Sequence, residues 1–443
     1  MNKPFKFPGL PRCVQIVFIA AFLYSCSPGA QLAKSAREDV LTTESLKTAH
    51  VGISVYEPAT GRYWYNHQAD KYFVPASNTK IPTCYAAMKY LGDSLVALRY
   101  ILNGDELILE PTGDPSFLQP EFRRQPVWQF LQTNNKRVVV SLSNWRDEPW
   151  GSGWSWNDYS ESYMAERSAF PIYGNVVRFS APVSALKVEP AYFARYTAPD
   201  SAQAPNRYPS NVQRTLADNQ FVVQARAEKE SSVEAPFYTQ NSALVTTLLS
   251  DTLHKTVERK DQPLNRSTAT IIHSQPTDSL LRPMMYRSDN FYAEQTLLMV
   301  SNEVLGYMSD SRIIDTILKT DFNDLPQRPR WVDGSGLSRY NLFTPQSMVA
   351  ILDKMQRQFG MERIKAVFPT GGTGTLASYY KADSTFIYAK TGTLSGVVAL
   401  SGYLYTRKNK LLIFSVLVNN HQASATTIRR SVETFLQGIR QNN

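Results

Sequence analysis

A serine and a lysine three residues apart lie where an extended run gives way to a helical pattern. In the segment 74–81, one helical turn would place Ser77 and Lys80 on the same face. A lysine amine in that position can accept the proton of the serine hydroxyl and turn it into a nucleophile. The pair therefore predicts covalent serine catalysis that works without histidine.

The same spacing occurs at two other places in the chain. Ser184 and Lys187 are followed by Val-Glu-Pro, which stops a helix almost at once. Ser378 and Lys381 stand before a short polar loop. Only Ser77 opens a sustained helical pattern. Its apolar positions recur at helical spacing: Ile81, Tyr85, Met88 and Leu91.

Composition and the first residues indicate an exported globular protein. The chain has 443 residues, 43% hydrophobic and 19% charged, which is long enough for two or three domains. Residues 1–25 join a basic start to an apolar run too short to span a bilayer, as in a signal peptide. The run ends at Leu-Tyr-Ser-Cys, which resembles the lipobox of bacterial lipoproteins. We expect a periplasmic protein anchored to a membrane through acylated Cys26, with ordinary signal cleavage as the alternative.

Cysteine usage and charge agree with export. Cys13 leaves with the signal, Cys26 would be acylated, and Cys84 then has no disulfide partner and is expected to be a small buried hydrophobe. Loss of the three basic residues in 1–25 lowers the net charge from +9 to +6, which suits anionic cell-wall surroundings. No basic stripe is interleaved with aromatic residues, so nucleic acid is not an expected partner.

Hydrophobic patterning predicts a catalytic domain split by an insertion. Residues 26–48 are polar and predict a tether. Residues 49–92 and 264–443 carry a β-hairpin, helices and long apolar strands, whereas 93–263 hold short strand-like pieces between loops rich in Gly, Pro, Asn and Trp. Helices and antiparallel strands in separate runs indicate an α+β architecture. The expected elements are the hairpin at 50–56 and 62–67, helices at 277–285 and 291–305, strands at 385–389, 397–405 and 411–418, and a last helix carrying Ile428, Val432, Phe435 and Ile439.

Two further motifs follow the Ser77 segment in order. Ser-Asp-Asn stands at 288–290 and Lys-Thr-Gly at 390–392, and with Ser-x-x-Lys they form the active-site signature of penicillin-recognising serine enzymes. Each is weak alone: 155–157 also matches Ser-x-Asn, Asn290 could cap a helix, and Lys390 could be a charge at a strand end. The three together are a strong signal.

With these motifs the chain resembles the D-alanyl-D-alanine carboxypeptidase/endopeptidases, the class C low-molecular-mass penicillin-binding proteins. The resemblance covers most of the mature chain and implies an antiparallel sheet flanked by helices, with a β-rich domain inserted between the first and second motifs. The gap between those motifs is much longer than in class A β-lactamases. Pro82 is a departure that should distort the first turn of the catalytic helix. Other family-like segments are Gly-Asp-Pro-Ser at 113–116, Gly-Trp-Ser-Trp-Asn-Asp at 153–158, Asp-Gly-Ser-Gly-Leu-Ser-Arg at 333–339 and Gly-Thr-Leu at 374–376.

The resemblance implies a role for each motif residue. Ser77 would attack the carbonyl of the penultimate D-alanine, and Lys80 would have to be neutral, so a dry site and the nearby Lys390 should lower its pKa. The oxyanion would be held by the backbone N–H groups of Ser77 and Thr393. Gly392 would let the substrate backbone lie against its strand. Ser288 would relay a proton to the departing amine, Asn290 would hold the peptide amide, and Lys390 and Thr391 would hold the terminal carboxylate.

Three residues outside the motifs are candidates for recognising the stem peptide. Asp158 and Arg339 match family positions that bind the amine and carboxylate of a diamino-acid side chain, and Tyr163 could form an aromatic wall of the same pocket. The alternatives are an Asx turn for Asp158, a surface ion pair for Arg339 and core packing for Tyr163.

The sequence thus predicts a serine DD-peptidase that cleaves peptidoglycan stem peptides and is inhibited by β-lactams. Water would release the acyl-enzyme, so neither a metal nor an organic cofactor is expected. A glycine-rich run at 371–374 lacks the Gly-Lys-Ser/Thr of a phosphate-binding loop and predicts a turn. The alternatives are a β-lactamase and a penicillin-sensing or cell-wall-binding module that acylates without turnover.

Overall fold

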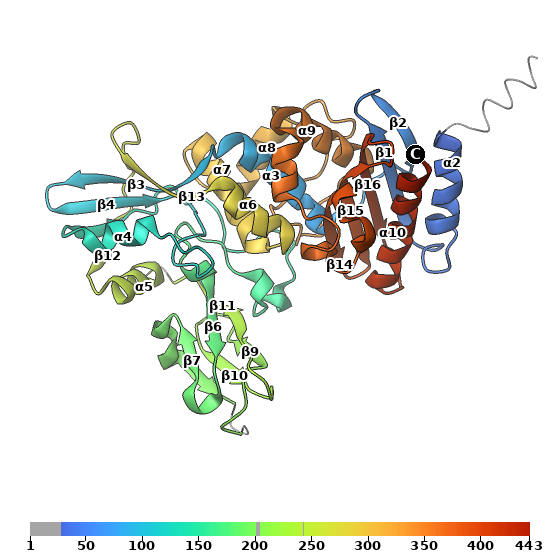
Figure 1. The fold of residues 1–443 in the computed structure, drawn as a ribbon. Helices are drawn as coiled ribbons and strands as arrows, with labels where there is room; N and C mark the ends of the chain where they lie inside the picture. The colour runs from blue at the N-terminus through green and yellow to red at the C-terminus, as the bar shows by residue number, and fades with distance from the viewer. Residues whose placement is uncertain (1–27, 201–203, 242) are drawn as a thin grey trace, which may run out of the picture.

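The computed structural model describes residues 28–200, 204–241 and 243–443. A large sheet with its covering helices forms one end of the molecule, and the inserted region forms the other (Figure 1). The expected signal segment and Cys26 lie outside the described residues.

The large sheet has five antiparallel strands in the order β14-β15-β16-β1-β2. Its two central C-terminal strands are buried along almost their whole length because helices cover both faces. That burial explains why they read as continuous apolar runs. The predicted hairpin is confirmed, and the strand predicted at 385–389 begins later and runs through the third motif. The strands are β1 His50–Glu57, β2 Arg62–His67, β14 Ile387–Leu394, β15 Val397–Tyr405 and β16 Leu411–Asn419.

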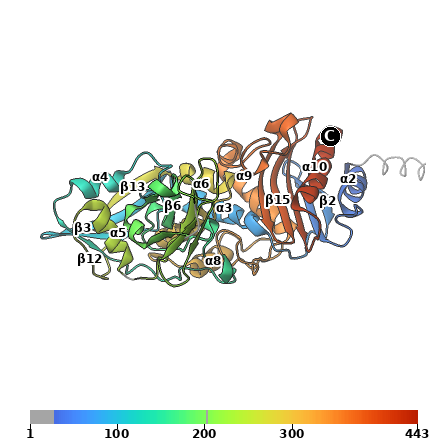
Figure 2. The ribbon, with the colours of Figure 1, turned by 90° about the horizontal axis from the view of Figure 1, so that it is seen from below.

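Helices cover the two faces of this sheet separately, with α9 on one side and α10 and α2 on the other (Figure 2). The predicted helices at 277–285 and 291–305 and the last helix are all present, and two apolar cores result, one on each face. One face carries α2 Pro28–Ala36 and α10 Ala425–Asn442. The layer beyond the other face contains α3 Lys80–Tyr90, α6 Thr277–Tyr286, α7 Asn290–Leu305, α8 Asp310–Lys319 and α9 Pro345–Val367.

The segment predicted as a tether is instead part of the folded body. Helix α2 continues into a π-helical turn at Arg37–Leu41, and its apolar side chains join the core beneath α10. Leu32, Ala36, Val40 and Leu46 are all buried. The prediction was wrong because isolated apolar residues in a polar stretch are typical of a loop. In the structure, Leu32, Ala36 and Val40 are four positions apart and fall on one side of the helical segment.

Helix α3 runs through the centre of the catalytic layer, and its first nine residues are all buried. The chain enters it through a 3-10 turn, η2, at Ala76–Thr79. Pro82 is the third residue of α3, where a missing N–H costs no intrahelical bond, so the disturbance expected from it is confined to this tighter entry. Cys84 is buried and free, as predicted.

The inserted region contains a five-stranded mixed sheet and two three-stranded sheets. The first has the order β12-β5-β4-β3-β13, with α4 and α5 beside it, and the smaller sheets project from it as a lobe (Figure 1). Its elements are β3 Ser94–Asn103, β4 Glu106–Pro111, α4 Pro126–Thr133, β5 Arg137–Val140, β6 Val176–Ser180, β7 Lys187–Glu189, β8 Thr197–Pro199, β9 Asn211–Arg214, β10 Phe221–Gln224, β11 Val233–Pro236, α5 Leu244–Leu253, β12 Val257–Arg259 and β13 Thr270–Pro276. The remaining 3-10 helices are Trp156–Asp158, Ser162–Met164, Tyr173–Asn175, Val183–Ala185, Ala191–Tyr196, Gly374–Leu376 and Lys381–Phe386.

The insertion ends later than the predicted boundary at 263. Strand β13 pairs with β3, the first strand of the insertion, and runs to Pro276 immediately before α6. Its partner β3 lies about 170 positions earlier in the chain. Hydrophobic patterning within a short window cannot reveal a pairing over that separation.

Packing of the N-terminal segment predicts a stability effect far from the motifs. Leu32→Ala should lower the free energy of unfolding by about 2–5 kcal/mol, because it removes a buried side chain from a close-packed core. Lys34→Ala is the matched control on the same helix; its side chain is exposed and the change should stay within about 0.5 kcal/mol. Urea unfolding of the two variants measures this. Equal midpoints for both would restore the tether interpretation.

Candidate active site

The serine and the lysine of the first motif are in contact. Lys80 Nζ lies 3.1 Å from Ser77 Oγ. It also donates to Asn290 Oδ1 at 2.7 Å and to the carbonyl oxygen of Ser335 at 2.7 Å. A neutral amine has two N–H groups and one lone pair. The two acceptors engage both N–H groups, so the lone pair is left facing the Ser77 hydroxyl.

Burial controls the protonation of Lys80. The side chain is fully buried, and burial lowers its pKa to about 8 although the carboxyl groups of Asp333, Glu294 and Asp289 oppose the shift. A lysine with that pKa is neutral in about a tenth of molecules at pH 7, far more than an exposed lysine. The amine is therefore suited to act as a general base.

The second motif lies at the start of α7, opposite α3. Ser288 has a positive φ of 64°, a conformation that costs a non-glycine residue energy and that recurs at functional sites. Asp289, not Asn290, caps the helix by accepting from the N–H of Tyr292 at 3.0 Å. Asn290 is left to bond Lys80 through its oxygen and the Tyr163 carbonyl through its nitrogen, at 3.0 Å.

The third motif brings the edge strand β14 against the nucleophile. Lys390 Nζ donates to Ser288 Oγ at 2.9 Å, and Asn78 Nδ2 donates to the Lys390 carbonyl at 2.8 Å. A Cβ at Gly392 would come within 2.7 Å of the Pro75 oxygen and 3.1 Å of the Ser77 nitrogen, so only glycine allows this approach. The strand is therefore held directly beside the reactive hydroxyl.

Lys390 is buried beside two other cations. Burial lowers its pKa well below the usual range, and the positive charges of Lys80 and Arg429 act in the same direction. The charge of Lys80 therefore favours the neutral form of Lys390. Thr391 is buried and Thr393 is exposed; the Thr393 hydroxyl accepts from Arg429 Nη2.

The three residues predicted to recognise the stem peptide lie on two loops. Tyr163 is bonded to Asp158, and burial together with that carboxylate raises the pKa of Tyr163 to about 12. The Tyr163 carbonyl connects this loop to Asn290. Arg339 is exposed and donates to the Ser395 carbonyl at 2.9 Å, beside the turn that follows β14. Arg339 has no ion-pair partner in the described part of the chain, so the surface ion pair considered for it is not made.

Two buried charged residues around the site, Glu294 and Arg167, lie outside every motif and family-like segment singled out from the sequence. Glu294, Asp333 and Asp289 face Lys80, and Arg167 reaches the same region from the insertion. Glu294 could have been found, because it lies four residues after Asn290 and hence on the same face of α7.

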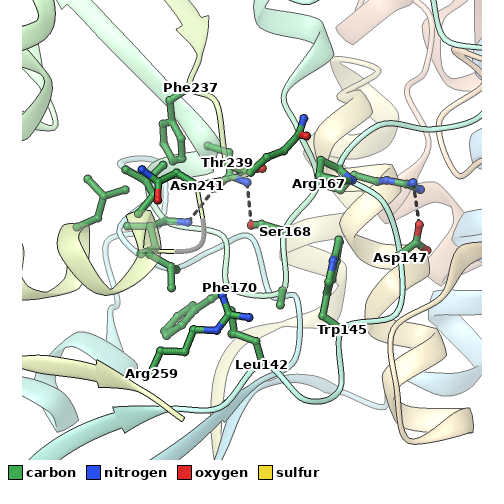
Figure 3. Close-up of a pocket in the computed structure, with 18 of the residues that line it drawn as sticks. Leu142, Trp145, Asp147, Arg167, Ser168, Phe170, Phe237, Thr239, Asn241 and Arg259 are labelled. Atoms are coloured by element: carbon green, nitrogen blue, oxygen red, sulfur yellow. Dashed lines mark hydrogen bonds and ion pairs between the residues drawn. The ribbon is translucent and has the colours of Figure 1, made fainter. Parts of the chain in front are cut away.

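A separate cavity of about 520 Å³ lies in the inserted region, between Trp145, Phe170 and Phe237 (Figure 3). None of the three motifs lines it. Two of its carboxylates are already engaged: Asp147 with Arg167, and Asp261 with Arg259 and the Leu142 N–H. Across residues 28–200, 204–241 and 243–443, no cluster of three or more His, Cys, Asp or Glu side chains could hold a metal ion.

Comparison with known proteins agrees with this geometry. Residues 33–438 match the D-Ala-D-Ala carboxypeptidase 3 (S13) family. The chain is 25% identical to a D-alanyl-D-alanine carboxypeptidase of an Actinomadura species, covering 93% of this chain and 87% of that protein. It is 23% identical to D-alanyl-D-alanine carboxypeptidase DacB of Haemophilus influenzae, covering 91% of this chain and 92% of that protein.

Solved structures show the same fold. Penicillin binding protein 4 from Haemophilus influenzae superposes with a TM-score of 0.70 at 21% identity, over 92% of this chain and 98% of that one. The same protein complexed with a β-lactam gives a TM-score of 0.65 at 20% identity, with the same coverage. The α+β fold with an antiparallel sheet and flanking helices is thereby confirmed. The family match spans nearly all of the described residues, so the chain belongs to the D-Ala-D-Ala carboxypeptidase 3 (S13) family and is a serine-type DD-peptidase.

Proposed function

We propose that Ser77 is the nucleophile of this DD-peptidase and that Lys80 is its general base. The observation that carries the proposal is the three-partner setting of Lys80, which leaves its lone pair on the Ser77 hydroxyl. The Ser77 proton moves to Lys80 as its oxygen bonds to the carbonyl carbon of the penultimate D-alanine. The backbone N–H groups of Ser77 and Thr393 hold the oxyanion.

Collapse of this intermediate breaks the C–N bond. The proton that Lys80 took from Ser77 is relayed to the departing amine through the hydroxyl of Ser288, which is bonded to Lys390, so Lys80 becomes neutral again and Ser288 keeps its hydroxyl. Water then attacks the acyl-enzyme and releases the shortened peptide, which restores the Ser77 hydroxyl. The Asn290 oxygen accepts from Lys80 and has a second lone pair for a substrate N–H, so it can serve both partners.

Substrate binding in this proposal uses both sides of the nucleophile. Lys390 and Thr391 hold the terminal carboxylate of a peptide or of a β-lactam. Asp158 and Arg339, with Tyr163 beside Asp158, bind the charged ends of a diamino-acid side chain in a peptidoglycan stem. Tyr163 is bonded to Asp158 and, through its carbonyl, to Asn290, which places the Asp158 loop next to the second motif and supports this assignment.

We further propose that the protein acts in the periplasm and is anchored through a lipid on Cys26. In the part of the chain that the structure describes, no helix could span a membrane. Only Ser27 separates Cys26 from α2, and α2 packs on α10. A lipid on Cys26 would therefore hold the folded body directly at the membrane surface.

The nucleophile is tested by acylation. A fluorescent penicillin should label the wild-type protein covalently and leave Ser77→Ala unlabelled, because Ser77 is the proposed nucleophile and its hydroxyl contacts the amine of the proposed base, Lys80. Muropeptides incubated with the two proteins should lose their terminal D-alanine or their cross-links only with wild type, as measured by mass spectrometry. Labelling of Ser77→Ala at the wild-type level would implicate Ser184 or Ser378, and rapid release of bound penicillin would indicate a β-lactamase.

The pH dependence of acylation tests the link between the two lysines. Neutral Lys80 is the reactive form, so the rate rises as pH increases through its pKa of about 8. If a protonated Lys390 repels the Lys80 charge, as proposed, Lys390→Ala should raise the Lys80 pKa, move the acidic limb of the pH–rate profile to higher pH and lower the rate strongly. Lys390→Arg keeps the charge but misplaces the carboxylate contact, so the limb should stay and some acylation should survive. If the acidic limb of the pH–rate profile of Lys390→Ala stays at its wild-type position, Lys390 does not change the Lys80 pKa. Carboxylate binding is then its only remaining proposed role.

The anchor is tested by fractionation. Wild-type protein expressed with its leader should pellet with membranes and carry acyl chains on Cys26, whereas Cys26→Ala should be released. Intact-mass analysis of the purified N-terminus measures this. An unmodified N-terminus downstream of Cys26 would show that the leader is removed by ordinary signal cleavage.

A further inference from the structure

A buried glutamate joins α7 to the backbone that holds the catalytic lysine. Glu294 is 1% exposed and lies one helical turn after Asn290. Its Oε1 accepts from the N–H of Ser335 at 2.7 Å, and the Ser335 carbonyl accepts from Lys80 Nζ at 2.7 Å. Glu294 and Lys80 are thus connected through the backbone of a single residue.

Neither of the acceptors that orient Lys80 is independent of α7. Asn290 is on this helix, and Ser335 is bonded to it through Glu294. If Ser335 were free to move, Lys80 would keep one acceptor and its lone pair would no longer be directed at Ser77. The position of Ser335 therefore decides whether the amine is a useful base.

The loop around Ser335 is packed too tightly to adjust without moving its neighbours. A Cβ on Gly334 would lie 2.6 Å from the Ala293 oxygen, and one on Gly336 would lie 2.0 Å from the Ala76 oxygen. The loop is thus wedged between α7 and the turn that carries the nucleophile. Asp333 fixes its far side by accepting from the N–H groups of Gly336 at 2.8 Å and Ser338 at 2.7 Å.

Arg167, in the inserted region, is a cation that offsets the free-energy cost of burying the Glu294 carboxylate. Arg167, 2% exposed, lies 3.4 Å from Glu294 Oε2, 2.6 Å from Asp310 and 2.9 Å from Asp147. Without it, the buried carboxyl groups would have no counter-charge. Burial and the neighbouring Asp333 raise the pKa of Glu294 to about 8, and Arg167 opposes that shift.

We propose that Glu294 is a positioning residue for acyl transfer: its carboxyl group fixes the Ser335 backbone so that the Ser335 carbonyl directs the Lys80 lone pair at Ser77. The inference rests on the proposed roles of Ser77 and Lys80. Arg167 extends the arrangement into the insertion, so this region contributes to catalysis by supporting the base as well as by any contact with substrate.

The experiment compares Glu294→Gln and Glu294→Ala by their penicillin acylation kinetics. The glutamine oxygen can still accept from the Ser335 N–H, so Glu294→Gln should keep most of the acylation rate constant at saturating penicillin. Glu294→Ala removes the acceptor, and the constant should fall on the order of tenfold to a hundredfold, with non-covalent penicillin binding unchanged. Equal constants for the two variants would overturn the proposal.

The acidic limb gives a second readout that does not require the alanine variant to fold. Burial lowers the Lys80 pKa, whereas the carboxyl groups of Asp333, Glu294 and Asp289 raise it when they are ionised. The pKa of Glu294 is itself raised to about 8, so its negative charge develops over the same pH range as the acidic limb. Glu294→Gln removes that charge, so the limb should move to lower pH. A limb that stays at its wild-type position would contradict the proposed coupling.

The matched controls are Glu303→Gln and Glu303→Ala. Glu303 is on the same helix and is also paired with an arginine of the insertion, Arg99, at 2.6 Å, but it has no contact with Ser335. Both controls should acylate at the wild-type rate, and the acidic limb of their pH–rate profiles should stay at the wild-type position.

The outcomes separate this inference from the proposed function. Absence of labelling in wild type would mean that the proposed function itself has failed. Normal labelling of both wild type and Glu294→Ala would overturn only the role of Glu294.

Discussion

Burial of the Lys80 amine is the constraint on which the rest of the site depends. An exposed lysine is almost wholly protonated at neutral pH and cannot take a proton from serine. Burial alone would favour the neutral amine strongly, but it would leave that amine without orientation. The structure supplies orientation with two acceptors, Asn290 Oδ1 and the Ser335 carbonyl, and moderates the pKa with nearby carboxyl groups. Basicity and direction are thus set by different neighbours.

The groups that meet at the site come from four separate segments: the turn at Ala76–Thr79 with the start of α3, the start of α7, the loop at Ser335, and β14. Strand β14 lies against the nucleophile turn because Gly392 has no side chain, and Asn78 ties its side chain to the same strand. The positive φ of Ala76, 47°, and of Ser288 marks the two places where the backbone is forced to present a reactive group. The surrounding core, buried on both faces of the sheet, is what can sustain that strain.

The inserted region is structurally part of the catalytic site. Arg167 is bonded to carboxyl groups of α7 and α8, Trp154 donates to Asp333, and the carbonyl of Tyr163 accepts from Asn290. A buried arginine shared by several carboxylates is costly to dismantle, because removing it strands several charges at once. The insertion therefore cannot move freely relative to the catalytic layer without disturbing the base.

The motifs that point to serine chemistry and most of the secondary structure were predictable from the amino-acid sequence. Ser77 with Lys80, the Ser-Asp-Asn and Lys-Thr-Gly motifs, the hairpin and the late helices were readable because each depends on spacing within a few residues, and local periodicity records such spacing. Strands β15 and β16, which are buried on both faces of the sheet, were predictable for the same reason. Their apolar runs need no partner to be recognised.

Contacts between residues far apart in the chain became known from the folded structure alone. Strand β13 belongs to the insertion because it pairs with β3, and residues 28–48 are folded because α10 offers them an apolar face. The link from Arg167 through Glu294 and Ser335 to Lys80 joins positions up to 255 residues apart. Local sequence carries no mark of such contacts, because the free energy of a buried charge is set by which partners the fold brings to it and not by its neighbours in the chain.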